Sequence, residues 1–253
     1  CGLLGVGTDA IPRIRSSIED HMASLTMDRA VFSRVESAYD LLWNFVDELV
    51  NEREHQGASD RDGLLDALIA TQQAGKLDGT ELRYLLLVLL IGGYDTSKNL
   101  LTMTMYLMLD RPSDWARCGS DLEFCGKVIE ETLRHSNIAT VFRSVREDFD
   151  YDGHRFPKNT LIAFATPLAN RDPAAFPEPM KFDLERPASN RHLAFGRGAH
   201  VCLGQFLARA QLEEGLHLIA QRIHQPQLAG DISWRPFLGA WGLRTLPIKF
   251  QLP

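Results

Sequence analysis

The segment at residues 195–204 combines residue types that suit a metal site. It reads FGRGAHVCLG, with one cysteine, Cys202, among three glycines, directly before a stretch of helical patterning. Glycine lets the backbone turn tightly and approach a large, flat group. A cysteine at the foot of a helix meets unpaired N–H groups and the positive end of the dipole, which favour its thiolate. A buried structural cysteine is the plainer alternative. Structural zinc is a poor one, because only His200 lies nearby as a second ligand.

A second group of residues with chemical potential lies at residues 92–97, GGYDTS, inside the proline-free segment 80–110. Two adjacent glycines destabilise a helix interior by about 2 kcal/mol relative to alanine, so a structural or functional need should offset them. Close helix packing is one such need. Asp95 beside Thr96 suggests another, because an acid and an alcohol in a buried, water-accessible groove can deliver protons.

Charged residues further along the chain give weaker signals. Glu131 and Arg134, spaced i and i+3, share a helix face, but exposed pairs of this kind are very common. Residues 143–146 include two arginines, and an arginine can hold a carboxylate through two parallel hydrogen bonds, which a lysine cannot reproduce. Arg146 is better explained as a solvated strand residue.

Taken in order along the chain, these motifs resemble the signatures of the cytochrome P-450 family of haem-thiolate monooxygenases. Residues 195–204 match its haem-binding pattern FGxGxHxCxG position by position. Residues 92–97 resemble its central-helix pattern, residues 131–134 its ExxR pair, and residues 182–186 the segment that supplies a second arginine. The resemblance implies haem b as cofactor and O2 as co-substrate, with Cys202 as the proximal iron ligand. A thiolate in that position favours O–O bond cleavage.

The resemblance also implies roles for further residues. Asp95 and Thr96 would deliver protons, and Glu131, Arg134 and Arg186 would form a structural triad. Contacts with the haem are implied for His200, Arg143, Phe195, Gly196, Gly198, Gly204, Gly92 and Gly93. Substrate contacts are guessed at Val88, Leu89, Ile138, Ala139, Val141, Ala240 and Trp241. Most of these side chains are apolar, which suggests a hydrophobic ligand, although any core would show the same.

The patterning predicts a helical first part and a turn-rich second part, with the change near Asn137. Helices are expected as two or three segments within residues 11–54, then at 64–73, 80–110, 122–134 and 203–222. Because the run 85–91 lacks a polar face, the long helix is expected to be buried there. Short strands are expected within 142–168, an irregular meander at 170–190 and a hairpin at 234–250. The expected class is mainly α with small β-sheets. The resemblance implies the cytochrome P-450 fold, with the haem between the long central helix and the cysteine loop.

Composition excludes several classes of protein. The 253 residues carry 27 basic and 33 acidic side chains, so the net charge of −6 argues against a nucleic-acid partner. No apolar run is long enough to cross a bilayer and no leader pattern opens the sequence, so no membrane partner and a cytoplasmic location are expected. The four cysteines are too sparse for a disulfide scaffold. No GxGxxG motif occurs, so electrons would come from a separate ferredoxin or flavoprotein.

The expected function is that of an enzyme, a monooxygenase that inserts one atom of O2 into a small hydrophobic substrate. Residues 1–253 are expected to form a single domain, the C-terminal part of a cytochrome P-450-like domain whose N-terminal part is absent. A truncated or degenerate haem-binding relative without oxygenase activity is one alternative. A haem-thiolate enzyme that catalyses coupling, cyclisation or peroxide-driven oxidation is another.

Overall fold

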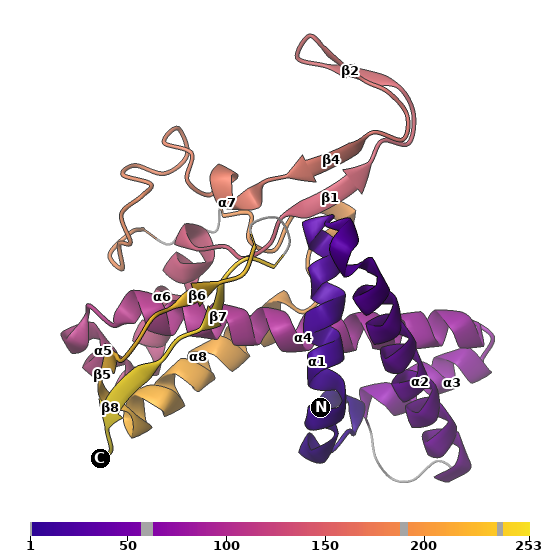
Figure 1. Cartoon of the computed structure of the whole chain (residues 1–253), viewed down its shortest axis with the longest axis horizontal. Coiled ribbons are helices and arrows are strands. Elements are labelled where there is room, and N and C mark those ends of the chain that lie inside the picture. The colour runs from indigo at the N-terminus through magenta and orange to yellow at the C-terminus, as the bar shows by residue number, and fades with distance from the viewer. Residues whose placement is uncertain (1, 57–62, 188–191, 237–239) are drawn as a thin grey trace. The chain divides into compact units, whose positions relative to one another are not determined.

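The computed structural model of the chain describes residues 2–56, 63–187, 192–236 and 240–253 (Figure 1). The chain falls into two compact units, Cys1–Thr96 and Ser97–Pro253. Helices dominate both units, and the strands of the described residues pair into two-stranded sheets. This confirms the predicted mainly α class with small sheets. Within the described residues, no helix combines the length and the apolar character needed to cross a membrane.

The first unit is helical. It contains α1 (Ile11–Met22), α2 (Phe32–Gln56), α3 (Leu64–Gln73) and the first part of α4 (Gly79–Met108), with the short 3-10 turns Gly2–Leu4, Thr8–Ala10, Ala23–Thr26 and Arg29–Val31. The start of α4 has a reciprocal cap. The Asp78 carboxylate accepts from the backbone N–H groups of Thr80 and Glu81 at 2.8 Å, and the Glu81 side chain accepts from the Asp78 N–H. Such reciprocal caps satisfy N–H groups that the first helical turn leaves unpaired.

The apolar run in α4 is not buried on all sides, so that prediction was wrong. Leu82, Leu86 and Leu90 face the core that α4 forms with α1, α2 and α3. On the other side, Leu85 is 39% exposed and Val88 is 66% exposed. The core of the unit covers only one face of α4. The remaining face also carries leucine and valine side chains, and these are exposed.

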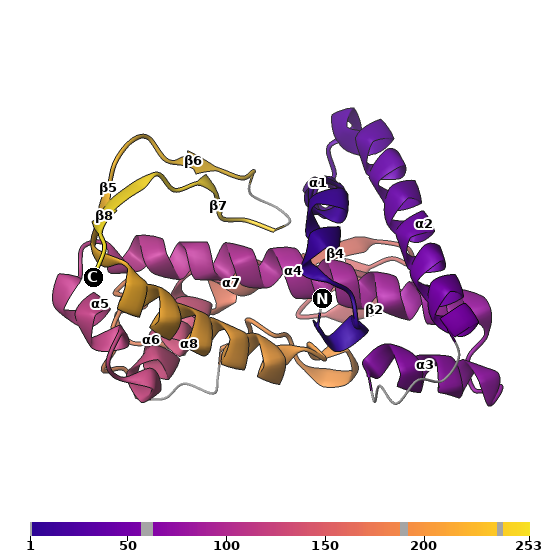
Figure 2. The same cartoon turned by 90° about the horizontal axis from the view of Figure 1, so that it is seen from below.

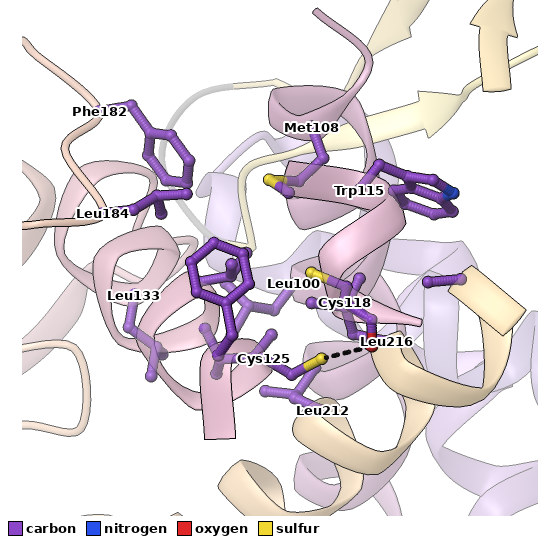
Figure 3. Packing of buried hydrophobic residues seen from close by; sticks show 14 of the residues in the cluster. Leu100, Met108, Trp115, Cys118, Cys125, Leu133, Phe182, Leu184, Leu212 and Leu216 are labelled. Carbon is purple, nitrogen blue, oxygen red and sulfur yellow. Dashed lines mark hydrogen bonds between the residues drawn. The ribbon is translucent and has the colours of Figure 1, made fainter. Parts of the chain in front are cut away.

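The second unit contains the rest of α4 and the helices α5 (Pro112–Cys118), α6 (Leu122–His135), α7 (Thr166–Ala169) and α8 (Gln205–Arg222). α8 packs against α5 and α6. Figure 3 shows the resulting core, in which α4 contributes Leu100 and Met108, α6 contributes Leu133, and α8 contributes Leu212 and Leu216. The Trp115 indole N–H is buried in this core and donates to the Ile223 carbonyl at 2.7 Å.

The strands in the described part of the second unit form antiparallel pairs. β1 (Val141–Ser144) pairs with β4 (Leu161–Phe164), and β2 (Phe149–Tyr151) pairs with β3 (His154–Phe156). β5 (His224–Leu228) pairs with β8 (Ile248–Gln251), and β6 (Ser233–Trp234) pairs with β7 (Leu243–Thr245) (Figure 2). The described residues of 170–190 contain no regular element, as predicted.

The C-terminal pairing begins earlier than the sequence predicts. The predicted hairpin at 234–250 starts with β6, whereas the structure adds β5 ten residues before it as the partner of β8. The sequence of this strand does not predict a strand, because Pro226 lacks the N–H group that a sheet's hydrogen-bond ladder needs and its neighbours are polar. The register shifts between His224 and Gln227, and Gln225 has φ +48°. This bulge accommodates the proline.

Candidate cofactor site

The loop that carries Cys202 is closed by its own backbone. The Cys202 N–H donates to the Phe195 carbonyl at 2.8 Å, and the Val201 N–H donates to the Gly198 carbonyl at 3.0 Å. Gly196 and Gly198 have φ values of +68° and +77°, a left-handed conformation that glycine adopts readily. The loop includes the 3-10 turn Gly198–His200 and leads into α8, so the free thiol of Cys202 is exposed just before that helix.

The surroundings of Cys202 fit a haem. Its neighbours Val201 and Leu203 expose apolar side chains, Leu203 to 86%, and a side chain built at Gly198 or Gly204 would meet no atom within 4 Å. Within the described ranges, no three His, Cys, Asp or Glu side chains gather in a way that could hold a metal ion. A single cysteine beside exposed apolar side chains suits a metal that brings most of its ligands with it, as haem does.

A charged cluster of Glu130 on α6, Arg209 on α8 and the irregular residue His192 contacts Phe195 at the start of this loop. Arg209 on α8 lies over the Phe195 ring, 4.5 Å from its centroid, and its Nε donates to Glu130 Oε1 at 2.6 Å. His192 Nε2 lies 3.1 Å from the other Glu130 oxygen. Burial raises the pKa of the Glu130 carboxyl, but the hydrogen bonds from His192 and Arg209 and their charges outweigh it and lower the pKa to about 2. These residues line a surface cavity of about 550 Å³ together with Gln205.

The local sequence patterns did not predict this cluster. Two positions offered a signal, since Glu130 directly precedes the ExxR pair and Arg209 lies in the second turn of the helix that follows Cys202. The contact itself depends on the packing of α6 against α8, which no local pattern reveals.

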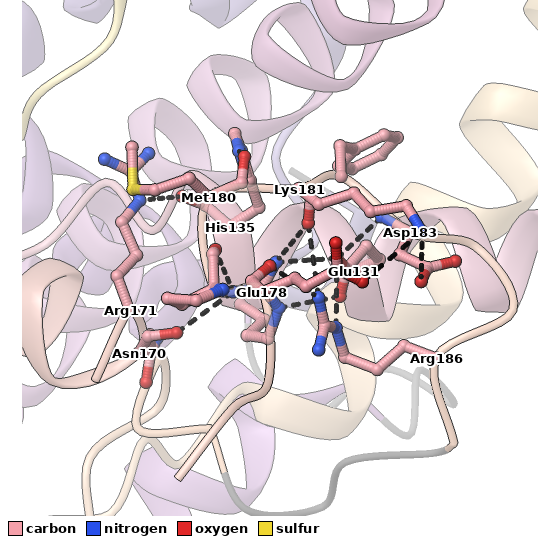
Figure 4. Close-up of polar contacts among 12 residues, drawn as sticks. Glu131, His135, Asn170, Arg171, Glu178, Met180, Lys181, Asp183 and Arg186 are labelled. Carbon is pink, nitrogen blue, oxygen red and sulfur yellow. Dashed lines mark hydrogen bonds and ion pairs between the residues drawn. The ribbon is translucent and has the colours of Figure 1, made fainter. Parts of the chain in front are cut away.

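The structure brings Glu131, Arg134 and Arg186 together. The Arg134 side chain is fully buried. Its Nε and one terminal nitrogen donate to the two Glu131 oxygens at 2.8 and 2.6 Å. Its remaining donors reach the carbonyls of Asn170, Pro179 and Lys181 at 3.1, 2.8 and 2.9 Å (Figure 4).

All five guanidinium N–H groups of Arg134 are therefore used. Arg186 Nε lies 3.4 Å from Glu131 Oε1 and donates from another nitrogen to the Pro177 carbonyl at 2.7 Å. The triad thus connects α6 to the irregular residues 170–187.

Asp95 and Thr96 lie at the end of the first unit, within α4. The Thr96 hydroxyl donates to the Gly92 carbonyl at 2.5 Å, one turn earlier. Asp95 is completely buried and makes a polar interaction. A side chain built at Gly92 or Gly93 would meet no atom within 4 Å, so within the described residues close packing does not explain these two glycines.

The remaining predicted residues lie in different surroundings. Arg143 is exposed on β1 and its guanidinium donates to the Phe142 carbonyl at 2.7 Å, while His200 is exposed in the cysteine loop. Val88 and Leu89 belong to the first unit, and Val141 opens β1. The structure brings the other four together: Ala139 bridges Ala240, and the Trp241 N–H donates to the Ile138 carbonyl at 2.8 Å.

Comparison with known proteins identifies the family. A sequence model of the cytochrome P-450 family matches residues 20–225. The chain belongs to the cytochrome P-450 family. Luteothin monooxygenase from Streptomyces thioluteus is 32% identical over 99% of this chain. 6-Deoxyerythronolide B hydroxylase from Saccharopolyspora erythraea is 34% identical over 82% of this chain.

Solved structures confirm the cytochrome P-450 fold. The econazole-bound cytochrome P-450 of Mycobacterium smegmatis superposes with a TM-score of 0.88 at 30% identity, over 98% of this chain and 63% of that one. The aligned region is likewise 62% of luteothin monooxygenase and 52% of the hydroxylase. The chain therefore spans between half and two thirds of the length of these relatives.

Proposed function

We propose that this chain forms the haem-binding part of a haem-thiolate monooxygenase. The observation that carries the proposal is the exposed Cys202 thiol in a loop closed by the Cys202 N–H, inside the family's haem signature. When bound, haem b supplies the reductive activation of dioxygen: two electrons and two protons are consumed, one oxygen atom enters the substrate and the other leaves as water.

Different residues of this chain would bind different parts of the haem. Cys202 would hold the iron as a thiolate ligand, and such a ligand favours O–O cleavage. Gly196, Gly198 and Gly204 would let the backbone approach the flat cofactor, and Phe195 would lie beside it. Arg143 and His200, both exposed, would contact the propionates, Arg143 through its guanidinium.

Proton delivery falls to Asp95 and Thr96. The Thr96 hydroxyl is held in place by its hydrogen bond to the Gly92 carbonyl. The buried Asp95 carboxyl belongs to the preceding residue of the same helix, so α4 carries an acid and an alcohol at consecutive positions. As the family resemblance implies, the two groups would together transfer protons.

The substrate is proposed to be a small organic molecule of apolar character. Ile138, Ala139, Ala240 and Trp241, which lie together, present apolar groups of the kind that line ligand pockets. As the family resemblance implies, a separate ferredoxin or flavoprotein is proposed as the electron donor.

Carbon monoxide binding tests the proposal. The reduced protein, expressed from its complete gene, should show the red-shifted Soret band of a thiolate-ligated haem. Cys202→Ala should abolish the band, whereas Cys118→Ala, which removes a thiol buried in the core, should retain it. A wild-type protein that lacks the band, or a Cys202→Ala variant that keeps it, would overturn the assignment.

A further inference from the structure

The Asn99 side chain ties the β6–β7 hairpin to the central helix. Asn99 lies on α4, is 1% exposed and donates from Nδ2 to the Trp241 carbonyl at 2.7 Å. The two residues are 142 positions apart in the sequence. The hydrogen bond therefore fixes a distant loop at a defined point of the helix.

Gly242 has no side chain, and the Asn99 amide occupies the space that a side chain there would need. A Cβ atom at Gly242 would lie 2.1 Å from Asn99 Oδ1 and 2.7 Å from Asn99 Cγ. Gly242 also has φ +151°, which L side chains rarely adopt. Only glycine at this position lets Asn99 reach the backbone of the hairpin.

The contact continues into the residues proposed to face the substrate. The Trp241 N–H donates to the Ile138 carbonyl, and Ala240 bridges Ala139. The Trp241 ring stacks on Trp234, with centroids 5.1 Å apart and planes 10° apart. Tyr106, two turns beyond Asn99 on α4, contacts the Trp234 ring edge-on. Asn99 thus fixes the hairpin to α4 at Trp241, and Tyr106 on the same helix contacts the hairpin at Trp234.

Stability alone does not account for asparagine at this position. Within the described residues, Asn99 Oδ1 is buried without a hydrogen-bond partner. An unsatisfied buried acceptor is destabilising, and an apolar side chain of similar volume would avoid it. What asparagine adds is a directional donor aimed at one carbonyl, which an apolar side chain cannot provide.

We propose that Asn99 is a positioning residue that sets the location of Trp241 and Ala240, and through them the shape of the substrate pocket. The inference rests on the proposed function, because that function makes these residues part of a haem-side pocket. Asn99 acts through the hairpin and does not itself touch the reacting atoms.

Two haem ligands of different size test the inference: imidazole and 1-phenylimidazole, titrated optically into the ferric holoprotein. In Asn99→Ala the carbon monoxide band should persist, and the ratio of the two dissociation constants should change at least about fivefold, the value of one hydrogen bond. Gly242→Ala should change the ratio too, and adding Asn99→Ala should reverse part of that change, because it removes the clashing amide.

The outcomes separate the two proposals. If wild-type protein lacks the thiolate Soret band, the proposed function fails. If the band is present and the ratio is unchanged in Asn99→Ala, or both ligands weaken equally, the positioning role fails alone. Should Asn99→Ala not retain haem, Asn99→Leu, which keeps the volume without the donor, is held to the same criterion.

Discussion

Replacing Arg134 with lysine should strongly destabilise the second unit. The substitution keeps the positive charge and most of the chain length, but an ammonium has three donors where the guanidinium has five. Arg134 uses all five, on both Glu131 oxygens and on the carbonyls of Asn170, Pro179 and Lys181. At least two acceptors must then lose their partner in a place where the arginine side chain is 0% exposed.

The magnitude follows from those two lost partners. Each buried acceptor left unsatisfied costs about 1–3 kcal/mol, so the free energy of unfolding should fall by about 4 kcal/mol. For a protein of this size, 1 kcal/mol shifts the melting temperature by about 2–4 °C. The expected decrease is therefore about 8–16 °C.

Thermal unfolding of the holoprotein, followed by circular dichroism, measures this decrease. Arg155→Lys is the matched control, because the Arg155–Asp148 pair is also in the second unit but is largely exposed. It should leave the melting temperature almost unchanged. If Arg134→Lys melts within about 2 °C of the wild type, the five-donor arrangement does not stabilise the fold as argued.

Two further predictions concern the charged cluster and the proton relay. The pKa of Glu130 is lowered in the folded protein to about 2 from an ordinary value of 4.5, so its stabilising effect is present above about pH 4.5 and is lost as the pH falls toward 2. Glu130→Gln should therefore lose less stability than the wild type over this range in acid denaturation, and identical pH profiles would contradict the assignment. Thr96→Ala should retain haem but divert electrons from product to hydrogen peroxide, whereas Thr96→Ser should couple normally; equal peroxide yields from the two variants would remove Thr96 from the relay.

Local patterns predicted most of the helices well. The capping residues and spacing around α3 and α6 place these elements within a residue of their observed bounds. The exposure of Val88 on α4 could not be predicted, because an apolar sequence does not show which parts of the helix surface other elements will cover. β5 was missed for a related reason, since the strand contains Pro226 and is defined by its partner β8.

The identity of the candidate site was determined by the sequence itself. Cys202 and its glycines lie within ten residues of one another, so a ligand and the backbone turns it needs are visible as one short pattern. The tertiary structure alone decided what holds that pattern in place. Arg134 is satisfied by carbonyls from residues 170, 179 and 181, and Asn99 by the carbonyl of residue 241. A backbone carbonyl is the same at every residue, so only the folded path of the chain shows which of them an arginine or an asparagine will meet.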